Sequence, residues 1–113
     1  MQEVGWGVMG VRLVAEVVSI TEVDGEEKVD EYGLIWKRFK RQLKIVGKRE
    51  FNRISEDLPN ELKGKIVEQE VWLCTAPEYE WHFTTKLGEK PLLITLSEEE
   101  SKEILKRMGI KGL

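Results

Sequence analysis

The sequence predicts a small α+β domain in which helices pack on one face of a mostly antiparallel sheet. Three patterns predict this class: runs of β-branched residues, stretches with helical periodicity, and a helix-capping motif near the end of the chain. The chain has 113 residues, of which 41% are hydrophobic and 35% charged, so we expect one domain over 1–113 and exclude a disordered chain. The expected order of elements is β-α-α-β-β-β-α.

The first element is expected between Val8 and Val23 and is interpreted as a strand, because the stretch from Val11 to Val23 is rich in valine and other β-branched residues. Apolar side chains occur on both sides of its middle, which indicates burial on both faces. The dipeptide Asp24-Gly25 follows and is a common turn signal, so we expect the strand to end there.

Two helices are expected next. Residues 30–46 place six apolar side chains within a stripe of ~100° on a helical projection, as an amphipathic helix requires. These side chains are Tyr32, Ile35, Trp36, Phe39, Leu43 and Val46. Gly47 is expected to cap this helix, and a shorter helix is expected over 49–58.

A hairpin of two strands, 65–75 and 78–87, is expected after the helices. Ala76-Pro77 would form its loop, and Trp72 would then lie opposite Trp81, since aromatic cross-strand pairs favour that register.

A short strand over 91–96 and a final helix complete the expected fold. Ser97 and Glu100 have the spacing of a capping box, in which the serine caps the helix and the glutamate lies at its third position. The single cysteine, Cys74, lies among apolar residues and is expected in the core.

The charges are unevenly distributed along the chain. The net charge is −3, but residues 36–53 carry +7 and the rest of the chain therefore carries −10. Directly upstream of the basic segment, residues 22–31 carry −5. An asymmetry of this size within one domain is the main functional signal of the sequence.

The first hypothesis is a non-enzymatic binding module that contacts nucleic acid or another polyanion through a basic amphipathic helix at 36–53. The cations expected to do this are Lys37, Lys40, Arg41, Lys44, Lys48, Arg49 and Arg53. The alternative is an oligomeric protein-interaction subunit in which the acidic segment 22–31 pairs with the basic segment 36–53. In that case the partner is a second copy or another protein.

A third hypothesis is a small hydrolase. Glu78, Glu80 and His82 would point to one side of a strand and could perform acid–base chemistry. The exposed face of an ordinary hairpin explains the same pattern and is favoured. We therefore expect no enzyme activity, no metal and no cofactor.

The composition also bears on the source and the compartment. Few Asn, Gln and Cys with many Glu and Lys is typical of thermophiles, so an archaeal or viral origin is expected. No apolar run reaches the ~18 residues of a membrane span, so we expect no membrane partner and a cytoplasmic location. Trp6, in a glycine-rich start, is a candidate anchor for a base or a partner.

Overall fold

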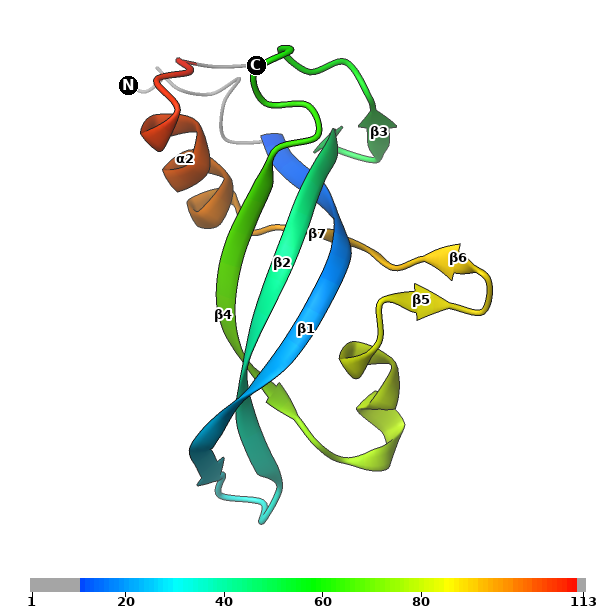
Figure 1. The fold of residues 1–113 in the computed structure, drawn as a ribbon, viewed down its shortest axis with the longest axis vertical. Coiled ribbons are helices and arrows are strands. Elements are labelled where there is room, and N and C mark those ends of the chain that lie inside the picture. The colour runs from blue at the N-terminus through cyan, green and yellow to red at the C-terminus, as the bar shows by residue number, and fades with distance from the viewer. Residues whose placement is uncertain (1–10, 112–113) are drawn as a thin grey trace. The chain divides into compact units, whose positions relative to one another are not determined.

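The computed structural model describes residues 11–111, and Trp6 lies outside them. The structure confirms the predicted α+β class and the mostly antiparallel sheet. The order of the elements differs from the predicted order (Figure 1). The strands are β1 (Val11–Val29), β2 (Ile35–Glu50), β3 (Arg53–Ser55), β4 (Ile66–Cys74), β5 (Lys86–Leu87), β6 (Lys90–Pro91) and β7 (Leu93–Thr95). The helices in the described range are the 3-10 helix η1 (Pro77–Phe83) and the α-helix α2 (Glu98–Arg107).

The main sheet follows the order β3-β2-β1-β7, and β4 also pairs with β2. The two partners β3 and β4 bind different stretches of the long strand β2: β4 pairs with residues 36–44 and β3 with residues 48–50. Both pairings are antiparallel. The strands β5 and β6 form a separate hairpin (Figure 1), and Gly88 between them has φ of +65°.

The described residues group into two compact units, each built from several chain segments. Unit 1 contains 11–15, 45–65 and 93–111. Its apolar core has ten described members that are at least nine-tenths buried and lie on β1, β2 and α2 or in loops: Val11, Leu13, Val14, Ala15, Ile45, Leu58, Leu62, Leu96, Ile104 and Leu105.

The helix α2 begins as the capping box predicts. Ser97 Oγ accepts a hydrogen bond of 3.1 Å from the backbone N–H of Glu100. The buried Ser101 then joins this helix to β1: its Oγ accepts from the N–H of Leu13 at 2.9 Å and donates to the carbonyl of Ser97 at 2.8 Å. This hydroxyl therefore acts both as a hydrogen-bond donor and as an acceptor.

Unit 2 contains 16–44 and 66–92. Its buried apolar side chains include Phe39 and Leu43 on β2 and Leu73 and Cys74 on β4, so the expected burial of Cys74 is confirmed. The ring of Phe83 in η1 contacts that of Phe39, with centroids 5.0 Å apart, and attaches η1 to this face of the sheet.

The prediction of two helices over 30–46 and 49–58 is wrong. The predicted layer of helices on one face of the sheet, which depended on them, is wrong as well. Residues 35–50 form β2. From Phe39 to Ile45, the odd-numbered residues, Arg41 included, are buried and the even-numbered residues between them are exposed. The alternation has a period of two, and the backbone finds its hydrogen-bond partners in neighbouring strands.

Three boundaries differ as well. The first strand is confirmed, but it continues past Asp24-Gly25 to Val29. The predicted strand 78–87 is mostly the helix η1, and Pro77 starts it, since proline suits the first turn of a helix. Trp72 consequently lies opposite Arg38 of β2, not opposite Trp81.

The predicted strand 65–75 is confirmed as β4, and the short strand near the end is confirmed in part as β7. Within residues 11–111, neither helix combines the length and the apolar character needed to span a membrane.

Candidate functional site

The seven cations predicted to lie on a basic helix at 36–53 lie instead on two strands, six of them on β2 and Arg53 on β3. Successive side chains of β2 point to opposite faces of the sheet. Lys37 and Arg41 therefore share the face of the buried Phe39, whereas Lys40 and Lys44 lie on the opposite, exposed face. No single ridge exists, because the expected 3.6-residue period does not apply.

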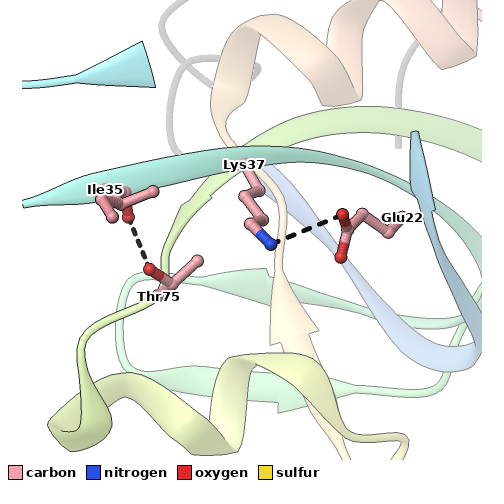
Figure 2. Close-up of polar contacts among 4 residues, drawn as sticks. All are labelled: Glu22, Ile35, Lys37 and Thr75. Carbon is pink, nitrogen blue, oxygen red and sulfur yellow. Dashed lines mark hydrogen bonds and ion pairs between the residues drawn. The ribbon is translucent and has the colours of Figure 1, made fainter. Parts of the chain in front are cut away.

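The inward-facing cations are held within their own chain. Arg41 is buried, and its Nε and Nη2 donate hydrogen bonds of 2.9 and 2.7 Å to Oε1 of Gln69. The ammonium of Lys37 lies 3.6 Å from a carboxylate oxygen of Glu22 on β1 (Figure 2). The acidic and basic segments thus meet inside one chain at this pair.

The exposed face of β2 and β4 carries charges of both signs. Lys40 lies opposite Glu70 in the strand register, and Arg38 Nη2 lies 3.1 Å from a carboxylate oxygen of the same glutamate. Lys40 and Lys44 themselves form no ion pair with another described residue. This face is therefore weakly basic, and its two most exposed cations are Lys40 and Lys44.

Trp72 on β4 has two cations against its ring. The ammonium of Lys28 lies 4.3 Å from the ring centroid and the guanidinium of Arg38 lies 5.8 Å from it. Both distances are within the range of cation–π attraction. These contacts attach β1 and β2 to β4 within unit 2.

The remaining predicted cations belong to unit 1. Lys48 lies 3.4 Å from a carboxylate oxygen of Glu50, and Arg49 Nε donates a 3.2 Å hydrogen bond to Oγ1 of Thr95. Arg53 is exposed on β3 opposite Glu50. An open hollow lies beside these strands, lined by Lys48, Glu50, Arg53, Ser55 and Asp57. Its lining is balanced in charge, so it gives no preference for an anion.

The sequence analysis identified the acidic segment 22–31 but missed that it forms the end of the β1–β2 hairpin, residues 22–35, which we call the acidic hairpin end. Its acidic side chains Asp24, Glu26, Glu27 and Glu31 are exposed. Three apolar or aromatic side chains are exposed among them: Tyr32 at 80%, Val29 at 62% and Ile35 at 41%. The hydroxyl of Thr75 donates to the carbonyl of Ile35 at 2.9 Å (Figure 2), and the backbone N–H of Thr75 donates to the same carbonyl at 2.9 Å.

Asp30 fixes the turn of this hairpin. One carboxylate oxygen accepts from the N–H groups of Tyr32 and Leu34 at 2.8 and 3.0 Å, and the other accepts from the indole N–H of Trp36 at 2.8 Å. The hydrogen bond from Trp36 is the largest cause that lowers the pKa of Asp30 below 3.8; desolvation opposes it and the two backbone groups add to it. Gly33 supplies the left-handed conformation, with φ of +80°.

The proposed hydrolase residues lie on η1, where the strand geometry that would align them is absent. His82 stacks on Tyr79 and contacts the edge of Trp81, and its Nδ1 is buried and finds no hydrogen-bond partner within residues 11–111. Desolvation lowers the pKa of His82 below 6.5, and the charge of Arg41 lowers it further. No group of three or more metal-ligating side chains occurs in the described part of the chain.

Comparison of the chain with protein-family models, with curated proteins and with solved structures finds no match in any of the three. The function must therefore be argued from the side chains themselves. Periodicity could not have revealed the acidic hairpin end, but the spacing of Asp30, Tyr32 and Gly33 is typical of a turn held by an aspartate.

Proposed function

We propose that this chain is a non-enzymatic, self-associating interaction module whose acidic hairpin end docks onto another protein chain. The observation that carries this proposal is Tyr32, an aromatic side chain left 80% exposed on a turn that Asp30 holds rigid. Exposed tyrosines on ordered supports are frequent energetic centres of protein interfaces. A turn that is ordered before binding loses little conformational entropy on docking.

The chemistry of the partner surface follows from the charges. Glu22 is already neutralised by Lys37, so the unpaired acidity lies farther along, at Asp24, Glu26 and Glu27. The complementary surface is basic, with an apolar patch that receives Tyr32 and Val29. This proposal retains the pairing of acidic and basic segments between copies that the sequence suggests.

The test is the molar mass of the full chain by light scattering and sedimentation, over a concentration series at ~50 mM and ~0.5 M salt. We expect the mass to rise with concentration at low salt and to fall towards one chain at high salt, because salt screens exposed charges. A mass of one chain under all conditions would remove the proposal.

A charge-reversal pair isolates the acidic hairpin end. Glu26→Lys with Glu27→Lys is expected to abolish the concentration dependence, because it turns the most acidic part of the end basic. The matched control is Glu78→Lys with Glu80→Lys, two exposed acids on η1 in the same unit. The control is expected to associate as the unmodified chain does.

A second candidate function is polyanion binding by the exposed face of β2. Lys40 and Lys44 favour it, because both are exposed on one side of the strand and neither is ion-paired with a described residue. They lie ~13 Å apart along the strand, a spacing that lets each contact a different phosphate. Together with Arg38, two or three phosphate contacts predict a log–log salt slope of roughly −2 to −3 on duplex DNA.

This candidate is tested by titrating labelled single-stranded and duplex oligonucleotides at ~50 mM salt. Lys40→Glu with Lys44→Glu is expected to weaken binding uniformly across sequences while the fold stays intact. A dissociation constant weaker than ~100 μM for every oligonucleotide would exclude it, since non-specific binders reach that range.

A further inference from the structure

Phe51 is placed in a way that protein stability does not explain. It occupies the two-residue turn between β2 and β3 with φ of 56°, a left-handed conformation that bulky residues rarely adopt. Its side chain is 86% exposed. Glycine would adopt the same backbone conformation without steric strain and would expose no apolar surface. Strain combined with an exposed aromatic ring points to a binding role.

The neighbours of Phe51 define the chemistry of the surface. Ile54 on β3 is 54% exposed, and Arg53 beside it is exposed as well. We call residues 50–54 the Phe51 turn. Glu50, which lies opposite Arg53 in the strand register, is neutralised by Lys48 at 3.4 Å, and Arg49 is bonded to Thr95. Arg53 forms no ion pair with another described residue, so it is the cation that this turn offers. The surface is thus an aromatic and an aliphatic side chain beside a guanidinium.

This surface has the chemistry that the acidic hairpin end requires of its partner. One side presents Phe51, Ile54 and a cation; the other presents Tyr32, Val29 and a cluster of carboxylates. Apolar contact between the two would be surrounded by charges of opposite sign, which is the usual arrangement of a specific interface. Both sets of side chains are exposed in the single chain, so each is open to a second copy.

We infer that the Phe51 turn of one copy binds the acidic hairpin end of a second copy, an inference that rests on the proposed function. Two different surfaces meet in such a contact, so the association is head-to-tail. In an open assembly, one end copy keeps an unused Phe51 turn and the other keeps an unused acidic hairpin end, so the assembly grows into longer chains or closes into a ring.

The test uses two variants that each lose one surface. The turn variant carries Phe51→Gly with Arg53→Gln. The hairpin variant carries Tyr32→Ser with Glu26→Gln and Glu27→Gln. Neutral replacements are chosen so that no new charge attraction arises between the variants. A control chain carries Lys63→Gln and Glu89→Gln, which remove one exposed charge of each sign elsewhere.

Each variant alone is expected to associate at least ~10-fold more weakly than the unmodified chain, as loss of an aromatic interface centre implies. An equimolar mixture is expected to form a two-chain species and nothing larger, because each variant supplies the surface that the other lacks. The control chain should associate normally. Phe51→Gly alone should melt at the same or a higher temperature than the unmodified chain, since glycine relieves the strain.

The outcomes separate this inference from the proposed function. An unmodified chain that sediments as a single copy throughout contradicts both. If the unmodified chain associates and the turn variant associates equally well, only the inference is overturned. If both variants are single copies and their mixture also remains unassociated, the inference is overturned, because a contact between the Phe51 turn and the acidic hairpin end would form in the mixture. A melting temperature of Phe51→Gly well below that of the unmodified chain would assign Phe51 a structural role and overturn the inference.

Discussion

The two units differ in the hydrogen bonding of their buried polar side chains. In unit 1, the buried Ser101 uses its hydroxyl as both donor and acceptor. In unit 2, Nδ1 of His82 is buried and has no hydrogen-bond partner among the described residues. A satisfied buried group stabilises a fold, whereas an unsatisfied one destabilises it. We therefore expect amide hydrogen exchange to be slower in the core of unit 1 than in η1 and the hairpin of unit 2.

The largest effect is expected from Leu62→Ala in unit 1. Leu62 is fully buried, so its truncation removes apolar burial and opens a cavity, at about 2–5 kcal/mol of unfolding free energy. Urea denaturation measures the change. The control is Leu93→Ala, the same replacement at a half-exposed site of the same unit, where a much smaller loss is expected. Equal losses at both sites would show that burial in unit 1 does not govern stability.

Ser101→Ala should have the next largest effect. It deletes the acceptor of the Leu13 N–H and leaves that buried donor unpaired, which destabilises the fold by about 1–3 kcal/mol. The denaturation midpoint should fall and the exchange of the Leu13 amide should accelerate. Unchanged exchange at Leu13 would mean that the hydroxyl is not its effective partner.

A smaller effect, confined to unit 2, is expected from Asp30→Asn. The folded pKa of Asp30 is lowered, so the carboxylate contributes stability above pH 3.8 that is lost as the pH falls through the lowered value. The unmodified chain should therefore exceed the variant in stability at neutral pH, and the difference should vanish in strong acid. Trp36 fluorescence follows the change directly, because its indole donates to Asp30. A difference that persists in strong acid would contradict this origin.

The smallest effect is expected from His82→Phe. Because the folded pKa of His82 is lowered below 6.5, the unfolded chain binds more protons, and stability falls as the pH drops below 6.5. Denaturation at pH ~7.5 and ~5.5 should show this loss in the unmodified chain and a smaller loss in the variant. Phenylalanine also removes the unpaired nitrogen, so the variant should match or exceed the original at both values. An identical loss in both proteins would exclude His82 as its source.

Local chemistry was the part of the fold that the sequence could predict. The capping box at Ser97 and Glu100 needs only neighbouring residues, and the structure forms its N-cap hydrogen bond. The valine-rich β1 and the apolar strand β4 were likewise evident. In each case the signal lies within a few residues and has one physical interpretation.

Segment 35–50 had two interpretations. Phe39, Leu43 and Val46 fit a helical stripe, while Phe39, Leu43 and Ile45 also fit a strand with a charged residue, Arg41, in an inward position. A cation at a buried site conceals the alternation, and its partner Gln69 is 28 residues away in sequence. Only the contacts with distant residues decide between the helical and the strand period. The candidate site predicted on the helix was therefore wrong in its geometry.

The hydrogen bond between Leu13 and Ser101 also has a consequence for the rate of folding. It joins residues 88 positions apart, and unit 1 draws on segments from the beginning, middle and end of the described chain. Contacts between such distant segments require the closure of long loops, which slows folding relative to folds dominated by local contacts. During synthesis, β1 leaves the ribosome before α2, to which it is hydrogen-bonded. Unit 1 therefore completes its core only after residues 98–107 have emerged.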